Sequence, residues 1–141
     1  MDTGKIRYAL LDLPLESIHK LAFKAAEATH CAEDQGKFWE MHHRLFENQK
    51  SLEPWNAHAD AIGLDVDKFQ QCMTVSKHAA AIRKDMAEAQ KSGSTGTPAF
   101  LLTITDPKNP SRVKGLSLFR GAQPFEKFKA EIDQALAAAG G

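Results

Sequence analysis

Helical spacing of apolar residues dominates the first two thirds of the chain. Ile18, Leu21, Ala25 and Ala28 recur at intervals of three and four residues. Because residues at this spacing share one face of a helix, the pattern predicts an amphipathic helix. Similar stripes follow over residues 38–45, 54–62, 66–73 and 79–89. The chain is therefore expected to contain a series of packed helices.

Three segments have the pattern of strands instead. Ile6–Leu13 is a nearly continuous apolar run that ends at Pro14, which is typical of a strand buried on both faces. Ala99–Thr105 and Val113–Phe119 predict a β-hairpin, because the residues between them are rich in turn formers. A last helical stripe covers 125–136. The pattern predicts an α/β protein with three strands and five to six helices.

Composition narrows the class of protein. A chain of 141 residues with 43% hydrophobic residues is long enough for one domain with a real core. Its 18 basic residues balance 18 acidic ones, so no electrostatic footprint for nucleic acid or an anionic membrane is expected. No segment is long and apolar enough for membrane insertion. The first residues do not resemble a signal peptide, so the chain as written is expected to be cytoplasmic.

The most informative short segment is Gly96-Thr97-Pro98, at the mouth of the predicted strand Ala99–Thr105. A proline removes a backbone donor and restricts the preceding residue to extended geometry. The bond before a proline is also the one kind of peptide bond in which the cis isomer costs little. The residues themselves leave two alternatives at Thr97-Pro98, a cis bond and a plain trans turn into the strand.

Several segments in order give the chain a resemblance to the DsbA-like thioredoxin family. They are an Asp-x-Pro-Leu turn at Asp12–Leu15, an Ala-x-x-Gln-Gly-Lys-Phe-Trp segment at Ala32–Trp39, a Phe-x-x-Cys helix at Phe69–Cys72, a Gly-x-x-Gly-Thr-Pro-x-Phe segment at Gly93–Phe100, and a Phe-Arg-Gly-Ala-Gln turn at Phe119–Gln123. The resemblance covers nearly the whole chain. It implies a single thioredoxin-like domain over residues 1–141, with a helical insertion at about 16–92.

The resemblance also implies a function, thiol–disulfide oxidoreduction, but the chain departs from the family at the decisive place. Family members carry a Cys-x-x-Cys motif at the start of the first helix, where the helix end lowers the pKa of the attacking thiol. This chain has no such motif. We expect a fragment that lacks the first core strand and helix and is inactive alone. A longer natural chain would imply a periplasmic or secreted setting.

The resemblance implies a cis bond at Thr97-Pro98, and it makes Gly96, Thr97 and Pro98 the expected substrate-binding residues. The family uses the backbone beside the cis-proline to hold an extended polypeptide. Cys31 and Cys72 stand where many family members have cysteines. They are either a structural disulfide or two buried thiols. No catalytic residue is assigned.

The remaining candidate chemistry gives no cofactor and no metal site. The chain has six histidines, but His42 and His43 are adjacent and point to different sides of a helix. There is no His-Glu-x-x-His motif and no phosphate-binding glycine loop. All six histidines are therefore interpreted as structural or surface residues.

Two other functions remain open beside the oxidoreductase fragment. One is a non-catalytic thioredoxin-fold module that binds extended peptides or a partner protein. The other is a glutathione-dependent isomerase or transferase of the DsbA-like branch. The expected partners are an extended polypeptide substrate or a redox partner protein. Because the missing strand would leave apolar edges on Ile6–Leu13 and Ala99–Thr105, a homodimer through these edges is also expected.

Overall fold

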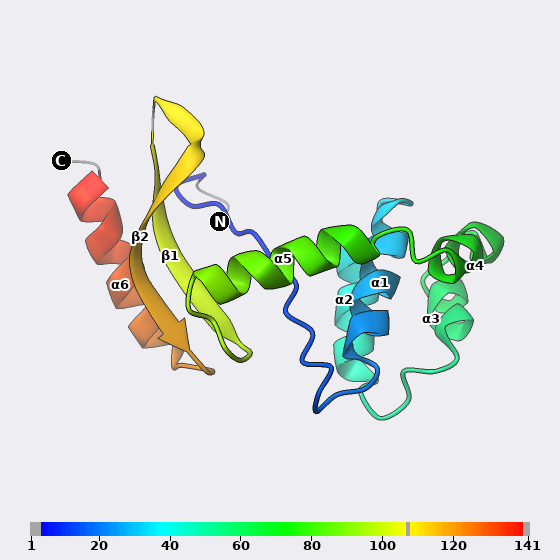
Figure 1. Ribbon diagram of the computed structural model, residues 1–141. Helices are drawn as coiled ribbons and strands as arrows, with labels where there is room; N and C mark the ends of the chain where they lie inside the picture. The colour runs from blue at the N-terminus through cyan, green and yellow to red at the C-terminus, as the bar shows by residue number, and fades with distance from the viewer. Residues whose placement is uncertain (1–3, 107, 140–141) are drawn as a thin grey trace. The chain divides into compact units, whose positions relative to one another are not determined.

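A computed structural model describes residues 4–106 and 108–139 of the chain (Figure 1). Its elements are α1 (Ala22–Glu33), α2 (Phe38–Glu47), α3 (Trp55–Ala61), α4 (Val66–Thr74), α5 (Ala79–Lys91), β1 (Ala99–Asp106), β2 (Asn109–Arg120) and α6 (Phe125–Ala139). None of the helices in these ranges has the length and hydropathy of a bilayer span.

The chain divides into two compact units, which we describe separately. The helical unit comprises residues 11–91 and contains α1 to α5. The hairpin unit comprises the described residues among 1–10 and 92–141, and contains β1, β2 and α6.

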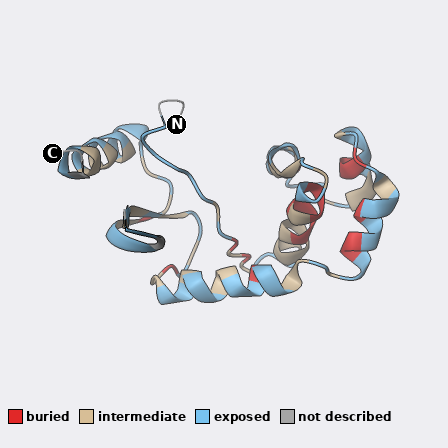
Figure 2. Cartoon of the chain, turned by 90° about the horizontal axis from the view of Figure 1, so that it is seen from above, coloured by how far each residue is buried: buried red, intermediate tan, exposed pale blue. Residues whose placement is uncertain are grey.

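The helical unit forms its core around α1, which contacts α2, α4 and α5. Ala28 and Ala32 of α1 are fully buried, and such small side chains allow neighbouring helices to approach closely. The other buried members of this core are Cys31, Met41, Leu45, Ala59, Leu64, Phe69, Cys72 and Met73. Figure 2 shows these buried positions as red segments gathered on the helices of this unit.

Single residues determine where α1 ends and where α4 begins, and these are the two helices that carry the cysteines. Gly36 has φ +74° just after α1, and the backbone N–H of Lys37 donates to the carbonyl of Ala32 at 3.0 Å. Glycine enters this left-handed region without steric cost, so α1 ends here. At the start of α4 the Asp65 carboxylate accepts a hydrogen bond from the backbone N–H of Lys68 at 3.1 Å, as an N-cap residue does.

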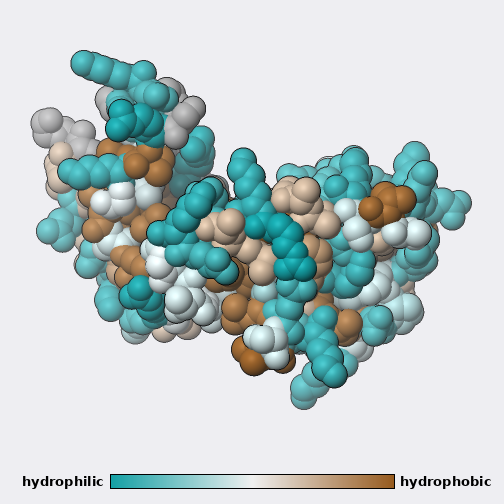
Figure 3. All heavy atoms as spheres, viewed as in Figure 1, coloured by the Kyte–Doolittle hydropathy of each residue, from teal (hydrophilic) through white to brown (hydrophobic). Residues whose placement is uncertain are grey.

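The hairpin unit consists of an antiparallel strand pair with one helix beside it. Ala99 of β1 pairs with Arg120 of β2, and the register shifts between Leu102 and Thr103. The Phe128 ring of α6 lies 4.8 Å from that of Phe100 (centroid to centroid). Figure 3 shows apolar residues at the surface over the hairpin. The unit therefore buries little of its apolar surface.

The prediction of a third strand is wrong. Ile6–Leu13 has no regular secondary structure, and the described residues form a two-stranded sheet of β1 and β2. An apolar run becomes a strand only if neighbours supply hydrogen bonds along its edges. Ile6, Tyr8 and Leu11 are 37%, 48% and 52% exposed, so the burial that the pattern predicted is also missing.

Candidate functional site

The predicted substrate residues Gly96, Thr97 and Pro98 lie together in the loop that precedes β1. Thr97 and Pro98 are exposed, and Gly96 is half-buried. The Thr97-Pro98 peptide bond is cis. The backbone N–H of Gly121 donates to the Pro98 carbonyl at 2.8 Å, which ties the loop to the end of β2. The hairpin therefore holds the loop in place while two of its residues face solvent.

The upstream part of the same loop is also anchored within the hairpin unit. Gly93 has φ +80°, and its carbonyl accepts a hydrogen bond from Nη2 of Arg120 at 3.1 Å. Ser94 is buried, and its hydroxyl lies 3.0 Å from that of Ser92. These contacts fix both ends of the loop, so it is a preformed surface feature and not a free connection.

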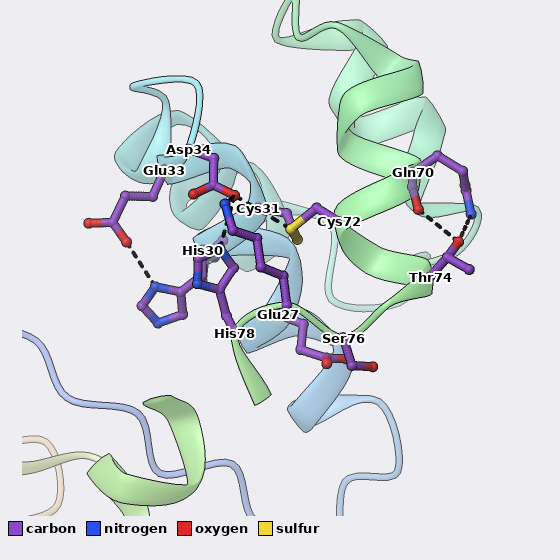
Figure 4. Close-up of a disulfide and its surroundings, with 12 residues drawn as sticks. Glu27, His30, Cys31, Glu33, Asp34, Gln70, Cys72, Thr74, Ser76 and His78 are labelled. Carbon is purple, nitrogen blue, oxygen red and sulfur yellow. Dashed lines mark hydrogen bonds and ion pairs between the residues drawn. A yellow bond between two sulfur atoms is a disulfide. The ribbon is translucent and has the colours of Figure 1, made fainter. Parts of the chain in front are cut away.

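The second candidate pair, Cys31 and Cys72, forms a disulfide that links α1 to α4 (Figure 4). Their Cα atoms are 5.8 Å apart, and both residues are buried. Of the two alternatives that the sequence left open, the structure has the disulfide. No thiol is then present for nucleophilic chemistry, because these are the chain's two cysteines.

A polar cluster lies against this disulfide. Oδ2 of Asp34 is 2.9 Å from Nζ of Lys77, 3.0 Å from Nε2 of His78 and 3.6 Å from Sγ of Cys72. Burial alone would raise the pKa of Asp34, but the hydrogen bonds from Lys77 and His78 outweigh it and lower the pKa. Both cysteines, Asp34 and Lys77 also line a pocket of about 320 Å³. The disulfide is thus next to an ionised carboxylate and to space that small molecules can enter.

A second cluster in the helical unit is built around His30 of α1. Its Nε2 lies 2.6 Å from Oδ2 of Asp12, and its Nδ1 lies 2.8 Å from Oε2 of Glu33. The hydrogen bond to Asp12 outweighs the effect of burial and, with Glu33, raises the pKa of His30 to about 9. His30 is therefore protonated at neutral pH, and it fixes the segment before α1 onto that helix.

Sequence reasoning missed the residues around the disulfide. Asp34 lies three positions after Cys31, so a shared helix face could have been noticed. His78 follows Cys72 by six positions and lies beyond the end of α4, so no periodicity connects the two. The structure also has a cis bond at Glu53-Pro54 that the sequence analysis did not single out.

The chain is similar to a protein family and to segments of several longer proteins. The family model for thioredoxin matches residues 1–133. The chain is 34% identical over 119 residues to the Na(+)/H(+) antiporter NhaA 3 of Salinispora tropica, covering 83% of this chain and 18% of that protein. It is 39% identical over 103 residues to NhaA 1 of Salinispora arenicola, covering 72% of this chain and 16% of that protein. The chain thus spans less than a fifth of these two curated relatives. No solved structure matches.

Proposed function

Because this chain belongs to the thioredoxin family, we propose that it acts in thiol–disulfide exchange of the DsbA-like kind. In this proposal its own part is to hold an extended polypeptide at Gly96, Thr97 and Pro98. The attacking thiol is supplied from outside residues 1–141, because Cys31 and Cys72 are joined to each other. The chain alone then has no oxidase or reductase activity.

The observation that carries this proposal is the exposed, anchored loop at Thr97-Pro98. Beyond this loop, β1 pairs with β2 on one edge, and no other strand pairs with it within residues 4–106 and 108–139. An extended peptide can bind such an edge by adding as a further strand, with backbone hydrogen bonds providing affinity. Recognition through backbone atoms suits a partner of variable sequence.

The names of the curated relatives do not change this proposal. Those proteins are described as Na(+)/H(+) antiporters, and the chain spans only 18% and 16% of two of them. The stretch that they share with this chain falls within the segment matched by the thioredoxin family model for most of its length. We therefore propose a thioredoxin-type role for this stretch and no ion transport.

A titration with an unfolded polypeptide tests the binding site. The ¹⁵N-labelled chain is titrated with carboxymethylated insulin B chain, and NMR shifts are followed for each residue. We expect the largest shifts at residues 96–98 and along β1. Thr97→Arg should weaken binding at least about tenfold, because a long charged side chain would obstruct the peptide. Thr74→Arg is the matched control, since Thr74 is an exposed threonine of the helical unit.

Two results would contradict the proposal. Equal peptide binding by the Thr97→Arg and Thr74→Arg variants would show that the loop is not part of the binding site. Insulin reduction by the purified chain, retained after removal of contaminating thioredoxins, would show that the chain carries its own redox chemistry.

A further inference from the structure

Donor atoms suited to a metal ion converge at the Cys31–Cys72 disulfide. Three ligand atoms lie within 4.8 Å of one another, one each from Cys31, Cys72 and His78. We propose that reduction of this disulfide creates a zinc-binding site. Its ligands are the thiolates of Cys31 and Cys72, Nε2 of His78 and the carboxylate of Asp34. The inference is independent of the proposed peptide binding.

The distances around Asp34 already approach those of a zinc site. Usual bond lengths place nitrogen and oxygen ligands about 3.4 Å apart on a tetrahedral zinc ion, and sulfur and oxygen ligands about 3.6 Å apart. Here Oδ2 of Asp34 lies 3.0 Å from Nε2 of His78 and 3.6 Å from Sγ of Cys72. Figure 4 shows these three side chains turned toward one another. Asp34 lies outside the group of donor atoms that are all within 4.8 Å of one another, so a four-ligand site also requires Asp34 and Cys31 to approach each other once the disulfide is broken.

The reduction step balances with an external dithiol as reductant. The disulfide takes two electrons and two protons from the dithiol, giving two cysteine thiols and the oxidised reductant. Zinc binding then releases the two thiol protons to solvent, because thiolates are the ligands. Cys31 and Cys72 line the pocket but are only 1% and 7% exposed, so a reductant or a metal ion reaches the sulfurs from this side when the surrounding side chains move.

The charges of the site also suit a divalent cation. Two thiolates and the Asp34 carboxylate carry three negative charges, and zinc neutralises two of them. Nζ of Lys77, 2.9 Å from Oδ2 of Asp34, offsets the third. The mixture of sulfur and imidazole ligands favours zinc over magnesium or calcium, which prefer oxygen.

The test compares zinc binding by the reduced and oxidised full-length chain under anaerobic conditions. Affinity is measured by competition with a chromogenic chelator, and cobalt(II) replaces zinc to report ligand type and geometry. We expect one zinc ion per reduced chain, none on the disulfide form, and a thiolate–cobalt charge-transfer band with tetrahedral visible bands. Reoxidation of the dithiol should also be slower with zinc present.

Substitutions of His78 and Asp34 test whether these residues are ligands or whether the two cysteines bind zinc alone. In the reduced chain His78→Ala and Asp34→Asn should each weaken zinc binding at least about tenfold, since even outer-shell partners matter by that much. His19→Ala, at an exposed histidine of the same unit, should leave it unchanged. Circular dichroism checks that each reduced variant is folded. If the reduced chain binds no zinc, or if binding is equal in all three variants, the proposal is wrong.

Discussion

The two units differ in how they bury apolar surface. In the described part of the hairpin unit, Phe119 is the one buried apolar residue, whereas the helical unit holds all the others. The hairpin unit leaves Leu101, Val113 and Phe125 at 48%, 55% and 73% exposure. The helical unit also exposes apolar side chains, among them Ile18 at 68% and Phe46 at 63%, so the difference between the units lies in the buried core and not in the exposed surface.

Topology explains this difference. Five helices can enclose a core with side chains from every direction, and the Cys31–Cys72 bond adds a covalent link between two of them. A two-stranded sheet with one helix covers at most one of its faces, and an isolated hairpin is only marginally stable in water. The two units therefore differ in how much of their stability a buried core can provide.

The largest expected effect comes from removing a core ring of the helical unit. Phe69 is fully buried, and Phe69→Ala should lower the free energy of unfolding of that unit by about 3–5 kcal/mol. Amide hydrogen exchange, measured residue by residue, should show the loss in α1 and α4 and little change in β1 and β2.

Phe119→Ala provides the matched change in the hairpin unit. The Phe119 ring lies 5.2 Å from that of Phe128, so its loss should deprotect β1, β2 and α6 while α1 to α5 keep their exchange rates. If either substitution lowers protection equally in both units, the chain unfolds as one cooperative body and the contrast between the units fails.

Loss of the disulfide should lower the free energy of unfolding of the helical unit nearly as much as Phe69→Ala. It closes a loop with a sequence separation of 41, for which the chain-entropy estimate is about 4 kcal/mol. We expect the double variant Cys31→Ser and Cys72→Ser to lower the stability of the helical unit by about this amount in urea unfolding. Hairpin-unit exchange rates serve as the internal control. A double variant as stable as the parent chain would mean that the core holds α1 and α4 without the bond.

The smallest of the expected effects is the pH dependence due to His30. Folding raises its pKa from 6.5 to about 9, so the folded state binds the proton more tightly. The resulting stabilisation is complete below pH 6.5, decreases as the pH rises toward 9, and is lost above it. Solvent screens this half-buried ion pair, so the contribution should be about 1–3 kcal/mol in the helical unit.

Urea unfolding at about pH 6 and about pH 10 measures this contribution. His30→Gln should remove most of the difference between the two pH values, whereas His19→Gln, at an exposed histidine, should leave it unchanged. An unaltered pH dependence in His30→Gln would show that the ion pair with Asp12 adds no stability.

Local patterns were sufficient for much of the fold. The hairpin expected at Ala99–Thr105 and Val113–Phe119 is present as β1 and β2, because alternation and turn residues act over a few positions. The helical stripes correspond to α2 to α6 for the same reason. The first stripe began too early: α1 starts at Ala22, and Ile18 is 68% exposed. Nothing local distinguishes a helical turn that packs from one that does not.

The candidate sites divide in the same way. The loop at Gly96, Thr97 and Pro98 could be chosen from the sequence, since the motif that carries the family resemblance there is a run of neighbouring residues. The cluster of Asp34, Lys77 and His78 could not, because these residues meet only when α1 and the end of α4 pack together.

By itself the sequence determined the order of helices and the hairpin and the family resemblance, because each depends on residues that are close along the chain. Tertiary structure alone decided that Ile6–Leu13 is not a strand, since pairing requires neighbours that a local pattern cannot provide. It also decided that Cys31 and Cys72 are bonded, because a disulfide requires Cα atoms within about 7 Å, and only packing of α1 against α4 brings them that close.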